Sequence, residues 1–117
     1  MDDKTLEMTM LLDFFGELLT EKQREYFDLY YNDDLSLSEI AETAGISRQG
    51  VRDQIRRAEE LLSRTEEKTG VVRRFREMQK TIADIGGDLE RLRLLVPDGE
   101  AQETVRSISE KLDTLKG

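Results

Sequence analysis

The residues whose chemistry is most suggestive lie between positions 47 and 57. Arginine and glutamine can each form two parallel hydrogen bonds with the edge of a base, arginine with guanine and glutamine with adenine. A serine at a helix start can help the first free N–H groups to hold a phosphate. An aspartate can accept a hydrogen bond from cytosine, but it also repels phosphate. The candidate binding residues are Ser47, Arg48, Gln49, Arg52, Asp53, Arg56 and Arg57.

Charge is distributed unevenly along the 117 residues, whose net charge is −8. Residues 1–45 carry 3 basic and 12 acidic side chains, net −9, and residues 81–117 carry 5 and 8, net −3. Residues 46–80 carry 10 basic and 6 acidic side chains, net +4. Because partner choice depends on the local field as well as on the total charge, the middle segment is the one that favours a polyanion.

The spacing of small and apolar residues around this segment predicts a helix-turn-helix. Ala41 is small where the first helix must let the second cross closely, and Gly45 suits the tight turn between them. We expect Ile46 to insert into the core below the turn. Val51 and Ile55, four residues apart, lie on the inward face of the second helix, which directs the candidate binding residues outward.

Helical periodicity extends over the whole chain, so the predicted fold class is all-α, with no strand pattern. Capping boxes are predicted where Thr20 precedes Gln23 and where Ser36 precedes Glu39. Gly70 is typical of a helix C-terminus. The expected helices are Lys4–Leu18, Thr20–Tyr31, Leu37–Ala44, Arg48–Lys68, Val71–Val96 and Ala101–Leu115.

The C-terminal part has a heptad pattern, which requires a packing partner. Pro97-Asp98-Gly99 separates its two helices and predicts an antiparallel helical hairpin. Gly86-Gly87 lies inside the first heptad seam, the apolar row of the first of these helices. Because glycine is unfavourable in a helix interior, we expect a close contact, a kink or a break there. We therefore expect a helix-turn-helix domain at 1–70 and a hairpin at 71–117 that dimerises or binds a partner, with a homodimer as the expected state. The seam residues are Val71, Phe75, Met78, Ile82, Ile85, Leu89, Leu92 and Val96, followed by Ala101, Val105, Ile108, Leu112 and Leu115.

Composition argues against several classes of function. The chain has no histidine and no cysteine, the commonest general-purpose catalytic side chains, and no glycine-rich phosphate loop after a strand. We therefore expect no catalytic residue, no cofactor and no metal site. No apolar run approaches the roughly 18–20 residues that span a bilayer, and the acidic start disfavours a secretory signal. The expected location is the cytoplasm.

Two related resemblances follow from these motifs. Thr20–Glu25, Asp34–Ala41 and Gly45–Gln49 resemble region four of bacterial sigma factors, which reads the minus-35 promoter element. The chain is more similar to the YlxM family of small bacterial proteins, whose members have a sigma region-four-like module, an extra N-terminal helix and a C-terminal helical extension. The similarity covers about residues 5–68, through Leu12–Gly16, Leu18–Thr20, Ser47–Val51, Asp53 and Ile55–Arg57.

The resemblance to the YlxM family implies a DNA-binding regulator linked to the signal recognition particle (SRP) pathway, chiefly through neighbouring genes. The partner is then DNA, the RNA of the particle, or the particle's GTPase. The apolar residue after Val51 falls at Ile55, one place later than in the sigma pattern, so promoter-like base contacts are not transferred. The alternative is a protein-interaction module that binds the SRP protein or its receptor without contacting nucleic acid.

Overall fold

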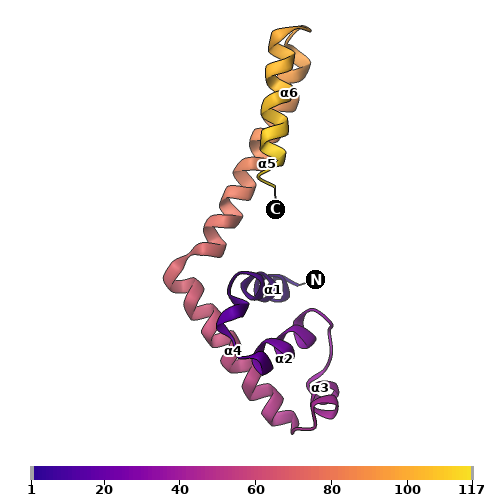
Figure 1. Cartoon of the computed structure of the whole chain (residues 1–117), viewed down its shortest axis with the longest axis vertical. Coiled ribbons are helices and arrows are strands. Elements are labelled where there is room, and N and C mark those ends of the chain that lie inside the picture. Colours follow the sequence, from indigo (N-terminus) through magenta and orange to yellow (C-terminus); the bar gives the residue numbers. More distant parts are fainter. Residues whose placement is uncertain (1, 117) are drawn as a thin grey trace. The chain divides into compact units, whose positions relative to one another are not determined.

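The computed structural model describes residues 2–116, and this part of the chain contains helices and no strand (Figure 1). The predicted all-α class is confirmed. The chain divides into two compact units, Met1–Val72 and Arg73–Gly117, called here the N-terminal and C-terminal units. The elements are α1 (Asp3–Phe15), the 3-10 turn η1 (Gly16–Leu18), α2 (Glu21–Tyr31), α3 (Leu37–Ala44), α4 (Arg48–Thr69), α5 (Val71–Leu95) and α6 (Glu100–Asp113).

Both predicted capping boxes are present, and they define where α2 and α3 begin. Thr20 Oγ1 accepts from Gln23 N at 3.1 Å while Gln23 Oε1 accepts from Thr20 N at 3.1 Å. Ser36 and Glu39 repeat the arrangement at 3.1 and 3.0 Å. The N–H group of Ser36 and its hydroxyl lower the pKa of the Glu39 carboxyl, because they favour the charged form.

The first α-helix is shorter than predicted. It ends at Phe15, and Gly16–Leu18 forms a 3-10 turn in which Leu19 N donates to Gly16 O at 3.1 Å. A Cβ added at Gly16 would lie 3.2 Å from Leu12 Cδ1, so glycine allows the chain to turn tightly against the helix. The turn leaves Leu18 exposed and buries Leu19.

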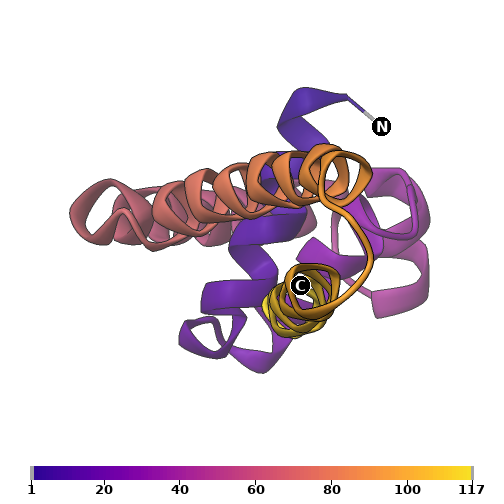
Figure 2. The ribbon, with the colours of Figure 1, turned by 90° about the horizontal axis from the view of Figure 1, so that it is seen from above.

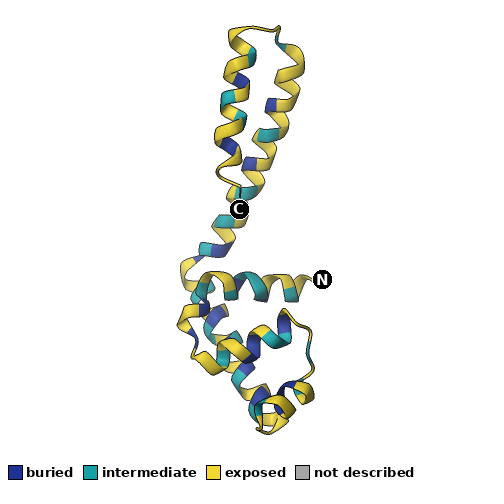
Figure 3. Ribbon diagram, turned by 45° about the vertical axis from the view of Figure 1, so that its right-hand side comes forward, coloured by how far each residue is buried: buried dark blue, intermediate teal, exposed yellow. Residues whose placement is uncertain are grey.

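The core of the N-terminal unit surrounds α4, which packs against α1, α2 and α3. Figure 3 shows the buried positions of these helices facing one another. Burying such apolar side chains is the main favourable term in folding. The start of α5 also contributes, because Val72 is buried in the same cluster and its N–H donates to Glu66 Oε1 at 2.8 Å. The largest fully buried side chains are Phe27, Leu11, Ile40, Leu62 and Val51.

One polar contact joins α2 to α4 inside this packing. The hydroxyl of Tyr31, a buried residue, donates a hydrogen bond to Glu59 Oε1. Its ring also packs on Phe27, with 4.7 Å between centroids. Burial raises the pKa of the Tyr31 phenol, and the hydrogen bond to Glu59 raises it further, so the phenol stays protonated over a wider pH range. The contact holds α4 in place on α2.

The C-terminal unit is a helical hairpin, as predicted. Ile82 and Leu89 of α5 pack against Val105 and Leu112 of α6. The Gln102 side chain closes the connection, since its amide donates to Arg93 O and to Val96 O, the latter at 2.8 Å. In Figure 2, α6 is seen along its axis and the connection crosses to it from the end of α5.

The two glycines of α5 do not interrupt the helix. The helix runs without a break from Val71 to Leu95. A Cβ added at Gly86 would meet Leu112 Cδ2 at 3.8 Å, an ordinary contact, and one added at Gly87 would meet nothing within 4 Å. Of the three alternatives that the sequence left open, the break is therefore wrong, because packing against α6 outweighs the cost of each glycine.

Candidate nucleic-acid interface

The turn before α4 has the geometry of a helix-turn-helix. Gly45 ends α3 in the left-handed region, at φ 73°, and its N–H donates to Ala41 O at 2.9 Å. Ser47 begins α4 as its N-cap, with Oγ accepting from Gly50 N at 2.9 Å. The Ser47 oxygen is therefore part of the helix start, and only its hydroxyl proton remains to donate to a ligand.

The structure places all seven predicted residues on the exposed surface around the first three turns of α4. The inward side of the same turns holds Val51, fully buried, and Ile55, 4% exposed. Helical spacing aligns three of the arginines, Arg48, Arg52 and Arg56, in a row of four-residue steps. Within residues 2–116, none of the four guanidinium groups on this face takes part in an ion pair or a hydrogen bond.

Ile46 does not occupy the core position that the sequence predicted. Its side chain is 42% exposed. It lies beside Gly50, where an added Cβ would sit 3.5 Å from Ile46 Cδ1 and 3.2 Å from Ser47 Oγ. Ile46 lies between the left-handed Gly45 and Ser47, the N-cap of α4, so the turn determines where its side chain points. Ile46 thus adds an apolar group next to the basic face of α4.

Gln49 and Asp53 are linked to each other. Gln49 Nε2 donates to Asp53 Oδ1 at 3.0 Å, one helical turn away. The bond restrains the Gln49 amide and leaves its carbonyl oxygen and one N–H able to bond elsewhere. It also gives Asp53 a partner on the protein, which the sequence alone did not reveal.

A cavity of about 300 Å³ opens beside the arginine row, between the start of α1 and helices α2, α3 and α4. Three of its lining side chains are basic, and one of these, Lys4, was not predicted as a site residue. No sequence signal indicates it, because Lys4 and Arg52 are brought together only by the packing of α1 in this unit. The lining residues are Lys4, Tyr30, Leu37, Arg52, Ile55, Arg56 and Glu59.

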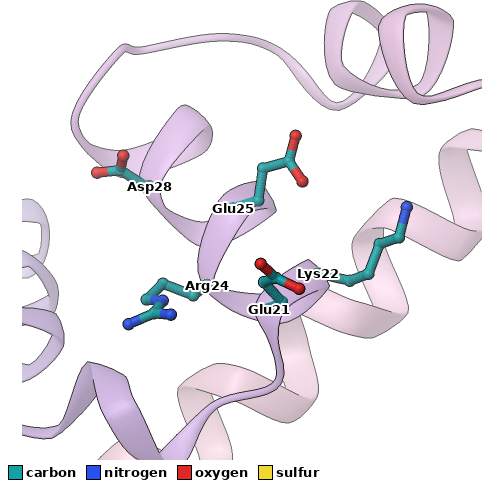
Figure 4. Close-up of a pocket in the computed structure, with 5 residues that line it drawn as sticks. All are labelled: Glu21, Lys22, Arg24, Glu25 and Asp28. Carbon is teal, nitrogen blue, oxygen red and sulfur yellow. The ribbon is translucent and has the colours of Figure 1, made fainter.

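Another surface hollow, on α2, has no single sign of charge. Figure 4 shows this hollow, where Glu21, Lys22, Arg24, Glu25 and Asp28 carry mixed charges whose ends point in different directions. Among the described residues there is no group of three or more histidine, cysteine, aspartate or glutamate side chains that could hold a metal ion. None of the described helices combines the length and the apolar character that crossing a membrane requires.

The fold and the α3–α4 geometry define an all-α protein of the helix-turn-helix class. The chain belongs to the UPF0122 family, whose description reads "putative helix-turn-helix protein, YlxM / p13 like" and whose pattern matches residues 2–96. It is 44% identical to a UPF0122 protein of Thermoanaerobacter sp. (strain X514) over 115 residues, 98% of both chains. It is 43% identical to one of Halalkalibacterium halodurans over 97% of this chain and 98% of the other. A third, from Caldanaerobacter subterraneus, is 54% identical over 85 residues, 73% of each chain.

Proposed function

We propose that this protein is a non-enzymatic, cytoplasmic regulator that binds nucleic acid through the exposed face of α4. The observation that carries the proposal is the row of Arg48, Arg52 and Arg56 with unpaired guanidinium groups beside Gln49. In helix-turn-helix proteins the second helix enters the major groove and its first residues meet base edges. We infer the same arrangement here: the first turns of α4 meet base edges, and Arg57 and Ser47 at the flanks contact phosphates.

The local charge of this surface supports nucleic-acid binding, although the chain as a whole is acidic. From Arg48 to Arg57, α4 carries four arginines and one aspartate, a local net charge of +3, whereas the whole chain carries −8. A polyanion is therefore attracted to this face and repelled by much of the remaining surface. Such binding depends on phosphate neutralisation, so affinity should fall steeply as salt is added.

The nucleic acid in this proposal is either duplex DNA or the RNA of the SRP. DNA is favoured by the helix-turn-helix geometry, and the RNA by the link of the YlxM family to the SRP pathway. Gln49 is our candidate for base recognition. The hydrogen bond from its Nε2 to Asp53 Oδ1, at 3.0 Å, limits the orientations of its amide before a base is bound. The neighbouring arginines would add contacts with guanine edges and with phosphates.

The test is binding of the purified protein to three labelled probes across a salt series: random duplex DNA, DNA from its own operon, and the SRP RNA. We expect one probe to bind, with a linear loss of log affinity against log salt. Reversing both Arg52→Glu and Arg56→Glu should weaken binding at least about a hundredfold, since each arginine contact contributes about 1–3 kcal/mol.

A matched control separates the α4 face from total charge. Arg106→Glu with Lys116→Glu makes the same charge change in the hairpin and should leave binding nearly unchanged. Circular dichroism should show that both double variants remain helical. Binding that ignores salt and both α4 substitutions would overturn the proposal.

A second candidate function is protein interaction. It is favoured by Leu94 and Leu95 at the end of α5, which are 76% and 80% exposed. Apolar side chains so exposed suit a protein partner, and the candidates are the SRP protein and its receptor. Calorimetric titration of the full chain into each of them tests this function. Binding that survives the Arg52/Arg56 reversal but is lost in Leu94→Glu/Leu95→Glu would favour it over the first.

A further inference from the structure

Only half of each heptad seam is used within the hairpin. On α5 the row that includes Ile82 and Leu89 is buried, and on α6 the row that includes Val105 and Leu112 is buried. The second row of each helix remains exposed, although its residues are equally apolar. These residues are Met78 (53% exposed), Ile85 (40%), Leu92 (43%), Ile108 (41%) and Leu115 (57%).

The two exposed rows lie on the same face of the hairpin. The helices contact each other through their buried rows. The positions four residues after Ile82 and Val105, Gly86 and Ser109, are partly buried, and a Cβ at Gly86 would meet Leu112 of α6 at 3.8 Å. Two antiparallel helices that contact through equivalent positions are related by an approximate two-fold axis perpendicular to both. Ile85 follows Ile82 by three residues and Ile108 follows Val105 by three residues, so the axis relates the two isoleucines and both lie on the same side of the hairpin. The five exposed side chains therefore form one surface, called here the apolar face.

The hairpin has too small a core to be complete by itself. Its unit spans 45 residues, Arg73–Gly117, and the cluster between its helices contains four buried side chains among the described residues. Units of this size usually need a disulfide, a metal or association to be stable. The chain has no cysteine. Covering the apolar face with two more helices would produce a four-helix bundle with a continuous core.

We propose that a second copy of this chain covers the apolar face, so that two hairpins form a four-helix bundle. The symmetric arrangement has its two-fold axis parallel to the helices, and α5 of each copy packs against α6 of its partner. Both exposed rows have heptad spacing, which allows their side chains to interdigitate. The proposal concerns the C-terminal unit and goes beyond the nucleic-acid role of α4.

Charge complementarity at the edges selects this arrangement. Asp88 lies beside the α5 row, three residues after Ile85 and four before Leu92, and Lys111 occupies the same position between Ile108 and Leu115 on α6. Within one copy these two residues lie at opposite edges of the apolar face. Asp88 Oδ1 already accepts from Arg91 of its own helix at 2.7 Å, which leaves its second carboxylate oxygen for another cation. When α5 stacks on the α6 of a partner, this oxygen faces Lys111 of the partner subunit, twice by symmetry. Like charges do not face each other at these positions.

Sedimentation equilibrium of the full chain, without nucleic acid, tests the proposal. The wild type should sediment as a dimer at tens of micromolar, and Ile85→Glu/Ile108→Glu should be monomeric, with dimerisation weakened at least roughly a hundredfold. Leu94→Glu is the matched control, because Leu94 is 76% exposed but points away from the apolar face, and it should leave the dimer intact. Circular dichroism verifies that each variant is helical.

A charge exchange tests the arrangement of the two copies. Asp88→Lys and Lys111→Asp alone should each weaken the dimer several-fold, and the double variant should recover most of the loss. A monomeric wild type, or a dimer that survives Ile85→Glu/Ile108→Glu, would overturn the proposal. Single exchanges that weaken the dimer without recovery in the double variant would overturn the pairing of α5 with the partner's α6.

Discussion

The two units of this protein are both helical but differ in how completely they bury their apolar residues. In the N-terminal unit, helices α1 to α4 and the start of α5 enclose 13 buried side chains in one cluster. In the C-terminal hairpin, two helices enclose four buried side chains, within the residues that the structure describes. Several short helices can surround a central one, whereas a pair of helices has only one line of contact. The first arrangement makes a self-sufficient support for the α4 face, and the second leaves an apolar surface for association.

The tyrosines allow the two units to be followed separately. All three, Tyr26, Tyr30 and Tyr31, lie in α2, and the chain has no tryptophan. Tyrosine fluorescence therefore reports on the N-terminal unit, while circular dichroism reports on the helices of both. Differences between the two signals during unfolding measure how far the units behave independently.

The largest effect is expected from the centre of the N-terminal core. Phe27→Ala should lower the free energy of unfolding of this unit by about 3–5 kcal/mol, because it leaves a cavity at a fully buried position. Urea unfolding followed by tyrosine fluorescence provides the measurement. Met78→Ala, in the hairpin and 53% exposed, serves as the control and should leave this signal unchanged. A cost below about 1 kcal/mol for Phe27→Ala would contradict the described core.

The contact between α2 and α4 should be next in size. Tyr31→Phe removes the hydrogen bond to Glu59 and should cost about 1.5–3 kcal/mol at neutral pH, since the acceptor is a carboxylate. The raised pKa of Tyr31 means that its stabilising effect is complete below the ordinary tyrosine value of 10.0 and is lost as pH rises above it. Wild-type stability should therefore decline more steeply in alkali than that of Tyr31→Phe. Parallel pH profiles would contradict this assignment.

A smaller loss is expected at the start of α3. Ser36→Ala removes the oxygen that accepts from Glu39 N at 3.1 Å, and should cost about 1 kcal/mol. Thermal unfolding followed by tyrosine fluorescence measures it. Ser38→Ala, two residues further along and exposed, is the matched control without a cap contact. Equal effects of the two substitutions would show that the capping box does not stabilise α3.

The smallest change should have the opposite sign and occur in the hairpin. Gly87→Ala should stabilise α5 by roughly 0.5–1 kcal/mol, because a Cβ at this helical position meets nothing within 4 Å. Gly45→Ala, at φ 73°, should instead destabilise the N-terminal unit by about 1 kcal/mol. Thermal unfolding by circular dichroism and tyrosine fluorescence distinguishes them. A destabilising Gly87→Ala would indicate that another helix covers this position.

Much of the candidate interface could be predicted because its determinants lie close together in sequence. The inward positions of Val51 and Ile55 follow from helical spacing, and these positions in turn direct Arg52 and Arg56 outward. Lys4 and the cavity beside these arginines could not be predicted, because they depend on how α1 packs in the N-terminal unit. The pairing of Gln49 with Asp53 is local, yet the sequence does not reveal which rotamers the two side chains adopt.

By itself, the sequence determined the all-α class, the capping boxes at Thr20 and Ser36, the left-handed Gly45, the helix end at Gly70, which is the C-cap of α4 with φ 63°, and the hairpin. Each of these depends on contacts within about four residues or on a simple periodicity. The tertiary structure decided that Ile46 is exposed, that Tyr31 binds Glu59, that α5 continues through Gly86-Gly87, and which heptad row is buried. These features depend on residues far apart in the chain, and packing energies there exceed the local preferences that a sequence pattern expresses.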